Sequence, residues 1–272
     1  PIEASEEILV SLSDFFLSYS VKLFKRFHKW DLSSLLVQKW ENLKTASSTS
    51  LVSWMGVLSG TLYMMKNYNH IYSALREYCE LTQNSSQSIL YGFFSFIEQV
   101  SVKYEQFKQE SNPEYQFDKV FINETYRKDP SVGRLACKVE PAGKVRVFAM
   151  VDILTQNVLK PLHLVLSKIL KALPNDGTFD QEGMVDRAYK KALFYKASYC
   201  YDLSAATDRL PIIIQVKIIE AMFGKRVSEL WKTILVDRPY YLPDNEVTRR
   251  IFKSDVNSIG QEYFYSTGQP MG

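Results

Sequence analysis

The feature that most constrains the fold is an apolar run that follows Pro211. Residues 212–223 read IIIQVKIIEAMF, in which one lysine and one glutamate are the only charged side chains. A helix that is apolar on nearly all sides has to be buried on most of its circumference. Proline is favoured at the start of a helix and glycine just past its end. We therefore expect a buried helix that begins at Pro211 and ends at Gly224.

Length and composition predict a folded protein and exclude several classes of site. The 272 residues suffice for one large or two ordinary domains. Hydrophobic residues make up 46% and charged residues 23%, as in globular proteins. A net charge of +3 is too small to indicate nucleic-acid binding by itself. Cys79, Cys137 and Cys200 form no Cys-x-x-Cys pair, so we expect neither a disulfide scaffold nor a zinc site.

The first 110 residues are expected to be mostly helical, because their apolar residues recur at a spacing of three to four. The uncharged run at residues 51–65 is shorter than the roughly 20 residues that span a bilayer, so we expect a buried helix rather than a membrane segment. Residues 111–132 have weak periodicity and are expected to be a connector. The other predicted helices run through residues 8–27, 32–43, 71–81 and 88–109.

The pattern then changes to the alternation that is typical of strands. ACKVE (136–140) leads through the turn-forming Pro141, Ala142 and Gly143 into KVRVFAM (144–150). In the second arm, the basic side chains point one way and the apolar ones the other. The sequence predicts a hairpin with a basic face, and a solvated strand face without function is the alternative.

Asp152 is expected to cap a helix that runs to Leu173 and is kinked by Pro161. Asp-, Gly- and Pro-containing stretches indicate turns and loops between the remaining helices. Further predicted elements are a turn at residues 174–181, helices through 184–193 and 227–236, and a loop at 238–250.

Two aspartates precede the apolar run. Residues 197–201 read as a short strand that ends at Asp202, and a tight polar turn then carries Asp208. Two carboxylates on rigid elements suit a divalent cation and a polyphosphate substrate, although such aspartates also serve as caps or turn formers. The final residues, 265–272, read YSTGQPMG and predict a mobile polar loop.

The basic hairpin, the two aspartates and the Ser-Thr-Gly loop occur in an order that fits nucleotidyl transfer. Magnesium takes a few carboxylates together with phosphate oxygens and water, so two such ions need an aspartate that bridges them. A triphosphate needs lysine and arginine to hold it and to take up charge in the transition state. A glycine loop with hydroxyl groups can contact a templating base or a sugar through short hydrogen bonds.

Four stretches resemble the viral RNA-dependent RNA polymerases of mitoviruses, of the narnavirus-like group: KVEPAGKVRVFAMVD (138–152), DGTFDQ (176–181), YDLSAATDRLP (201–211) and STGQPMG (266–272). They match motifs F, A and B of that family in order. The resemblance implies an α+β, right-hand polymerase fold without its thumb. Its parts would be a helical N-terminal region (1–110), fingers with the basic motif F hairpin (111–195) and a partial palm with motifs A and B (196–272).

The resemblance also implies catalytic roles for the two aspartates. Asp202, the first aspartate of motif A, would ligate both catalytic metals, with the Leu203 carbonyl as a further ligand. The metal would be Mg²⁺, with Mn²⁺ as the alternative. Asp208 would bind the incoming nucleotide by accepting a hydrogen bond from the ribose 2′-hydroxyl.

The other motif residues would contact nucleotide and template. The implied triphosphate ligands are Lys138, Lys144 and Arg146. The implied loop beside template and nucleotide consists of Ser266, Thr267, Gly268 and Gln269. The expected partners are an RNA template, its product and ribonucleoside triphosphates, with no stable protein partner and no membrane contact. The implied location is the host mitochondrion.

One departure from the family pattern concerns the second half of the metal site. The sequence contains no Asp-Asp pair, so the Gly-Asp-Asp of motif C is absent, as are motifs D and E. We therefore predict that these residues bind Mg²⁺ weakly and polymerise nothing by themselves. Two alternatives are a non-catalytic, genome-integrated remnant that survives as an RNA-binding module, and a reverse transcriptase. A reverse transcriptase would normally carry a bulky aromatic residue near Asp208, so the acidic residue argues against it.

Overall fold

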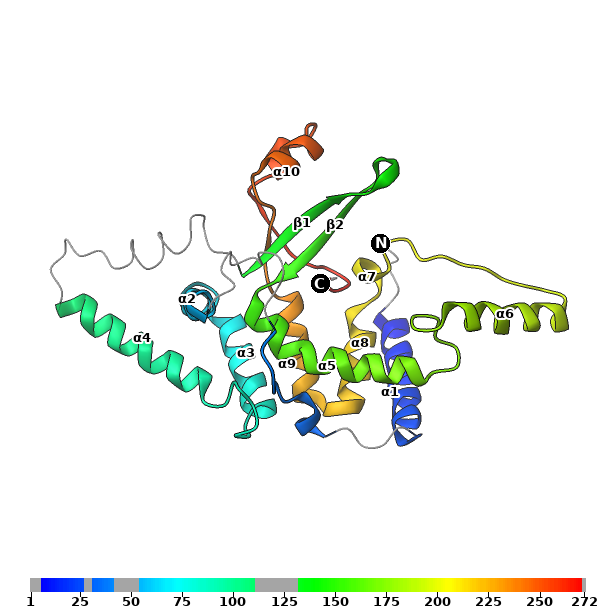
Figure 1. Ribbon diagram of the computed structural model, residues 1–272, viewed down its shortest axis with the longest axis horizontal. Helices are drawn as coiled ribbons and strands as arrows, with labels where there is room; N and C mark the ends of the chain where they lie inside the picture. The colour runs from blue at the N-terminus through cyan, green and yellow to red at the C-terminus, as the bar shows by residue number, and fades with distance from the viewer. Residues whose placement is uncertain (1–5, 27–30, 42–53, 111–131, 271–272) are drawn as a thin grey trace.

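Helices form most of the molecule, and a β-hairpin rises from one side of them (Figure 1). The structure is a computed structural model that describes residues 6–26, 31–41, 54–110 and 132–270. The α-helices are α1 (Glu6–Arg26), α2 (Trp54–Asn67), α3 (Asn69–Thr82), α4 (Phe93–Glu110), α5 (Ile153–Ala172), α6 (Gln181–Tyr195), α7 (Ala206–Arg209), α8 (Ile212–Phe223), α9 (Lys225–Val236) and α10 (Glu246–Ile251). Short 3₁₀-helices are η1 (Leu32–Leu35), η3 (Pro141–Gly143) and η4 (Val256–Ser258). The α+β class is confirmed.

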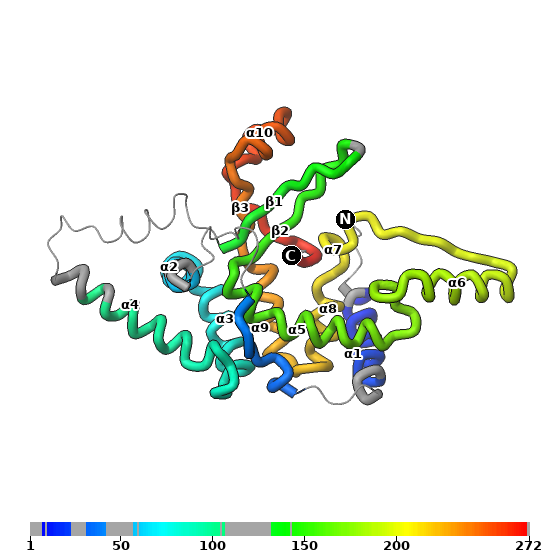
Figure 2. Tube along the Cα trace, in the orientation of Figure 1, coloured from blue at the N-terminus to red at the C-terminus, as the bar shows by residue number. Residues whose placement is uncertain are grey.

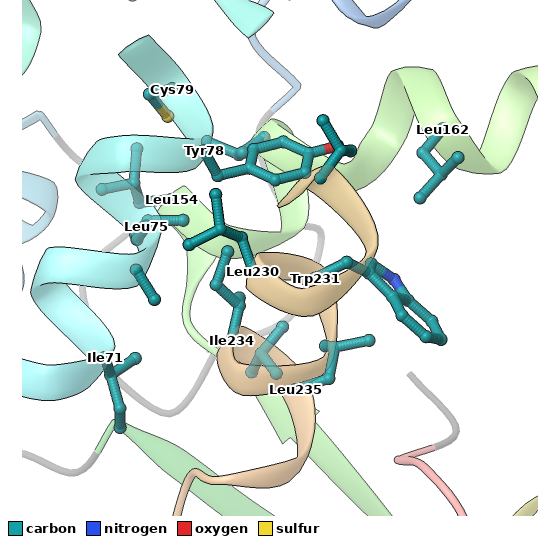
Figure 3. Close-up of a cluster of buried hydrophobic side chains, with 14 of the residues drawn as sticks. Ile71, Leu75, Tyr78, Cys79, Leu154, Leu162, Leu230, Trp231, Ile234 and Leu235 are labelled. Carbon is teal, nitrogen blue, oxygen red and sulfur yellow. The ribbon is translucent and has the colours of Figure 1, made fainter. Parts of the chain in front are cut away.

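The core forms where α3 and α9 pack together with α5 alongside (Figure 3). Leu75 of α3 and Ile234 of α9 are fully buried at 0% exposure, and Leu154 of α5 is 2% exposed. Burial of each such side chain stabilises the fold by about 1.5–3 kcal/mol relative to exposure. The core therefore joins helices from both halves of the chain.

The apolar run forms α8, as predicted. This helix starts directly after Pro211 and ends at Gly224, whose φ is 94°. It packs between α1 and α9. Ile213 remains 38% exposed, so the helix is covered on most of its circumference and not on all of it. Its buried side chains are Ile214, Val216, Ile219, Met222 and Phe223.

The predicted hairpin is also confirmed. Strands β1 (Gly133–Val139) and β2 (Val145–Val151) pair antiparallel through seven residues each, and η3 connects them. Strand β3 (Tyr240–Tyr241) pairs parallel with β1, and β4 (Glu262–Tyr263) pairs antiparallel with β3, giving the order β2-β1-β3-β4. Val139 and Val147 lie on the face opposite to Lys138 and Arg146 and are 58% and 42% exposed, so the apolar face of the hairpin is not buried in its outer half.

A buried arginine ties the base of this hairpin to the helices. Arg238 has 0% exposure and forms an ion pair with Asp152, with 2.5 Å between Nη1 and Oδ2. It also donates to the carbonyl oxygens of Val132 at 2.7 Å and Ile234 at 2.9 Å, and to the Thr155 hydroxyl at 2.8 Å. Asp152 in turn caps α5, as predicted, by accepting from the Thr155 amide at 2.9 Å. One guanidinium thus joins the end of α9, the start of α5 and the residue before β1.

The helix predicted at residues 32–43 is wrong. The structure has only the short η1 there, followed by irregular backbone up to residue 41, and the end of the predicted range lies outside the described residues. The Val37 amide donates to Gln83 Oε1 at 2.8 Å, and the Val37 carbonyl accepts from the Ile89 amide at 2.9 Å. These long-range partners take up the backbone groups that a helix would otherwise pair.

The first predicted helix is present as α1, but its apolar stripe does not face the core. Phe15 and Tyr19 are 62% and 54% exposed, whereas Ser13 and Ser20 are buried. Helix α1 packs against α8. Because α8 is apolar almost all round, it can be covered by the small side chains of α1, which allow the two helices to approach closely.

Several other predicted boundaries also change. The buried helix predicted at residues 51–65 is present from Trp54 as α2. Its buried side chains form one stripe, which consists of Val57, Thr61 and Met64. Helix α4 begins at Phe93 rather than at residue 88, and the predicted loop at 238–250 contains β3 and α10. The connector predicted at residues 111–132 lies almost wholly outside the described residues. Among the helices that are described, none combines the length and hydropathy needed to span a membrane.

Replacing Arg238 with methionine should destabilise the protein strongly, because the Asp152 carboxylate would remain buried without its counter-charge. Removing one partner of a buried ion pair typically costs about 3–5 kcal/mol. Urea unfolding followed by circular dichroism would measure the change in the free energy of unfolding. Arg226→Met is the matched control, because it removes an ion pair with Glu77 whose side chains are 57% and 38% exposed. Equal unfolding midpoints for the two variants would contradict the structural role of Arg238.

Candidate functional site

The aspartate turn, defined as residues 202–211, reverses the chain before α8. Ala205 has a φ of 52° and a ψ of 48°, the left-handed region that non-glycine residues rarely occupy. Its carbonyl accepts from the amides of Asp208 and Arg209, both at 3.1 Å, and this closes the single turn of α7. Such a conformation costs of the order of 1–3 kcal/mol and persists only where surrounding contacts impose it. Asp208 therefore sits on a turn that its surroundings hold in place.

The strand predicted at residues 197–201 is wrong. This segment has no regular secondary structure. Tyr199 and Tyr201 are 82% and 91% exposed. A strand requires a neighbour that takes up its backbone hydrogen bonds, and none of the four strands in the described residues pairs with this segment.

Asp202 lies at the end of this exposed segment and makes no hydrogen bond or ion pair with another described residue. Leu203 is 72% exposed. Hard cations such as Mg²⁺ take oxygen ligands and keep several water molecules. The open carboxylate of Asp202 and a nearby backbone carbonyl fit part of such a ligand set. Among the residues that are described, no group of three or more His, Cys, Asp and Glu side chains is arranged to hold a metal ion.

The C-terminal loop, residues 264–270, docks on the aspartate turn (Figure 2). The Gln269 amide donates to the Thr207 carbonyl at 3.0 Å, and the Ile212 amide donates to the Thr267 carbonyl at 2.9 Å. Gly268 is buried between these bonds, and a Cβ atom there would lie 2.1 Å from the Thr207 oxygen. The loop predicted to be mobile is thus held by backbone contacts, and only a glycine fits at its centre.

Tyr265 joins the C-terminal loop to the hydrophobic core. Its ring packs edge-on against Tyr240, with 5.5 Å between ring centroids and 85° between ring planes. Burial raises the pKa of the Tyr265 hydroxyl, and the negative charge of Asp208 raises that pKa further. Sequence reasoning missed both tyrosines. The one available signal was an aromatic residue next to the Ser-Thr-Gly loop.

The basic hairpin, defined as residues 133–151, presents its cations as predicted. Lys138 lies directly opposite Arg146 in the antiparallel register, so the two share a face. Arg146 forms a 3.1 Å ion pair with the partly exposed Glu140. Lys138 and Lys144 are exposed and form no ion pair with other described residues.

The structure therefore brings some of the predicted site residues together and leaves others apart. Asp208 meets the C-terminal loop, whose residues Ser266 and Thr267 are exposed beside the buried Gly268. Among the described residues, no hydrogen bond or ion pair links the basic hairpin to Asp202 or Asp208. In the view of Figure 1, the free end of the hairpin and α7 lie toward the same side of the molecule.

Comparisons with known proteins identify similar sequences. The profile of the family described as mitovirus RNA-dependent RNA polymerase matches residues 28–272. A stretch of 148 residues is 34% identical to the RNA-directed RNA polymerase of Cryphonectria parasitica mitovirus 1, covering 53% of this chain and 16% of that protein. Another of 60 residues is 40% identical to an uncharacterized mitochondrial protein of Arabidopsis thaliana, covering 22% of this chain and 23% of that protein. The matches thus span less than a quarter of either relative. No solved structure matches the chain.

The substitution Gly268→Ala should release the C-terminal loop, because its Cβ atom would overlap the backbone of the aspartate turn. Hydrogen exchange followed by NMR should then show faster exchange at the amides of Gln269 and Ile212, which donate the two docking hydrogen bonds. Gly177→Ala is the control, since its Cβ atom would meet only the flexible Met184 side chain, at 3.3 Å. Unchanged protection in Gly268→Ala would show that the loop does not depend on this close approach.

Proposed function

Because the chain belongs to the mitovirus RNA-dependent RNA polymerase family, we propose that it forms the part of such an enzyme that carries motifs F, A and B. The enzyme would copy an RNA template by a two-metal ribonucleotidyl transfer in viral RNA replication. The observation that carries this proposal is the docking of the C-terminal loop on the aspartate turn. The stretches that resemble motifs B and A lie far apart in the sequence and meet at Asp208, as a shared nucleotide site requires.

The two aspartates would have different tasks in this site. We assign Asp202, with the Leu203 carbonyl, to the metal ions, because its carboxylate is exposed and free of partners among the described residues. Bound Mg²⁺, or Mn²⁺ in its place, would polarise the phosphate oxygens and take up negative charge. We assign Asp208 to the ribose, where its carboxylate would accept a hydrogen bond from the 2′-hydroxyl. That contact would favour ribonucleotides over deoxyribonucleotides.

The basic hairpin would supply positive charge to the triphosphate. Lys138 and Arg146 share one strand face, and Lys144 is exposed at the start of the second arm. Lysine and arginine offset phosphate charge as it redistributes during transfer. Ser266, Thr267, Gly268 and Gln269 would then contact the templating base and the nucleotide.

We propose that these 272 residues do not polymerise by themselves. Asp202 supplies one carboxylate to the metal site, and the sequence has no Asp-Asp pair to supply the opposite side. The second half of the site would come from a Gly-Asp-Asp motif in a longer polypeptide. The similar proteins of a mitovirus and of a plant mitochondrion favour a mitochondrial setting.

A second candidate is a non-catalytic relative of such polymerases that binds RNA and makes none. The similarity to an uncharacterized mitochondrial protein of a plant favours this alternative, because it shows a related sequence outside a virus. A reverse transcriptase is disfavoured by the family membership and by the acidic residue at Asp208. Metal-dependent nucleotide binding distinguishes the two remaining candidates.

Asp202→Asn should abolish most of the Mg²⁺-dependence of GTP binding, because it removes the charged metal ligand. Equilibrium dialysis of radiolabelled GTP against the 272-residue chain, with and without Mg²⁺, would measure this. Asp186→Asn on α6 is the control, since it neutralises another exposed carboxylate, which pairs with Lys190. In a longer polypeptide that adds Gly-Asp-Asp, Asp202→Ala should abolish template-directed RNA synthesis. Retained synthesis would contradict the metal-ligand role.

Removing the positive charges of the hairpin should lower the affinity for the triphosphate group in particular. The double substitution of Lys144 and Arg146 by alanine should reduce the preference for GTP over GMP and the dependence of GTP binding on salt, because both reflect charge–charge attraction. Competition dialysis at two ionic strengths would measure both quantities. Lys190→Ala, which removes an exposed lysine from α6, is the control. An unchanged preference for GTP would show that the basic face is a solvated strand face that does not bind the triphosphate.

A further inference from the structure

Helix α6 and the segment that follows it lie at the surface along their whole length. None of the residues of α6, all of which the structure describes, is buried. In Figure 1, α6 extends away from the helical core, and the chain after it returns toward α7. Among the described elements, none packs extensively against α6. The side chains of α6 therefore contribute little to the core and are available for an interaction.

Aromatic rings are concentrated on this part of the surface. Their exposed fractions run from 62% to 82%, and they belong to Tyr189, Phe194, Tyr195 and Tyr199. Phe194 and Tyr195 are arranged edge to face, with 4.9 Å between ring centroids and 87° between ring planes. Single exposed apolar residues need no explanation, but exposed apolar residues that gather in one place mark interaction sites.

Positive charge is interleaved with these rings. Residues 187–199 contain no acidic residue, and their basic residues are Arg187, Lys190, Lys191 and Lys196. Arg187 and Lys190 pair with acidic side chains that precede this stretch, at 3.3 and 2.6 Å. Lys191 and Lys196 are exposed and form no ion pair with other described residues. Two cations are therefore left for the negative charge of a partner.

The backbone connects this surface to the aspartate turn. Lys196 ends α6 with a φ of 55° and a ψ of 28°, the left-handed region that residues with a side chain rarely occupy. The chain reverses there and continues through Tyr199 to Asp202, with every residue on the way exposed. A polymer bound along the rings would thus extend up to the candidate site.

Unpaired bases and phosphates match this combination of side chains. Bases stack on exposed aromatic rings with little regard to sequence, and lysine side chains neutralise phosphates. A duplex hides the faces of its bases and is recognised by its shape, its phosphates and its 2′-hydroxyl groups. The core of a protein–protein interface is depleted in lysine. A single strand therefore fits the rings and the cations better than either alternative.

We propose that the aromatic surface, defined as residues 187–199, binds single-stranded RNA beside the aspartate turn. Its rings stack on unpaired bases, and Lys191 and Lys196 contact phosphates. The choice of RNA rests on the proposed function, in which RNA is the partner of both candidates. The surface itself lies between the stretches at 176–181 and 201–211 and adds an RNA contact outside motifs F, A and B.

The double substitution Tyr195→Leu and Tyr199→Leu tests the stacking, because leucine is apolar and has no planar ring. Fluorescence anisotropy with a short labelled RNA that has no self-complementarity measures the Kd of the 272-residue chain. The substitution should raise this Kd by at least about fivefold, as expected for the loss of one base stack. Tyr19→Leu with Tyr91→Leu is the control, since it removes two rings that are 54% and 63% exposed elsewhere, and it should preserve the Kd.

The double substitution Lys191→Gln and Lys196→Gln tests the phosphate contacts. For single strands, the slope of log affinity against log salt falls by about 0.7 for each phosphate contact that is lost. The same anisotropy measurement at several salt concentrations gives this slope. Lys232→Gln with Lys253→Gln is the control, because it removes two exposed lysines from other parts of the surface. Equal slopes in the two double variants would overturn the phosphate contacts.

Three further outcomes separate the aromatic surface from the rest of the account. A wild-type Kd in Tyr195→Leu with Tyr199→Leu would overturn this surface and leave the RNA partner of the proposed function standing, whereas a wild-type chain that binds no single-stranded RNA would overturn both. Equal affinities of the wild-type chain for single-stranded and duplex RNA would overturn the stacking. Mg²⁺-dependent GTP binding should be preserved in the tyrosine variant, and an equal loss of GTP and RNA binding would overturn a local role of the rings.

Discussion

The buried ion pair between Arg238 and Asp152 is the interaction on which the remaining structure depends. Its guanidinium donates to α5, to the end of α9 and to the carbonyl just before β1. A charge inside the core is tolerated only when its partners are fixed, so this pair sets where the hairpin leaves the helices. It also holds the chain two residues before Tyr240. The ring contact between Tyr240 and Tyr265, which joins β3 to the C-terminal loop, therefore lies close in the chain to the same buried charge.

Local features could be predicted from the sequence where neighbouring residues decide the outcome. The apolar run between Pro211 and Gly224, the Asp152 cap and the alternation of the hairpin each carry their own signal. The prediction of a helix at residues 32–43 was wrong because the backbone of Val37 forms hydrogen bonds with Gln83 and Ile89. Long-range contacts of this kind leave no periodicity in the sequence, and the same holds for the burial of Arg238.

In the candidate site, too, local features could be predicted from the sequence and long-range contacts could not. Motif spacing pointed to Asp202, Asp208 and the Ser-Thr-Gly loop. It gave no indication that Gly268 would lie against the Thr207 carbonyl or that Tyr265 would pack against Tyr240. The expected strand before Asp202 required a partner strand, and composition cannot supply one. The turn that we propose to contact the ribose is consequently docked against the C-terminal loop, while Asp202, the proposed metal ligand, is an exposed carboxylate.

We propose that the aspartate turn and the C-terminal loop form one nucleotide site with a metal at Asp202. Paramagnetic line broadening by Mn²⁺ tests it most directly, in amide NMR spectra of the chain with and without GTP. Broadening should centre on Asp202 and Leu203, and it should strengthen and reach Asp208 and Gly268 when GTP is added. Broadening centred on other acidic residues, or the same pattern without GTP, would contradict it.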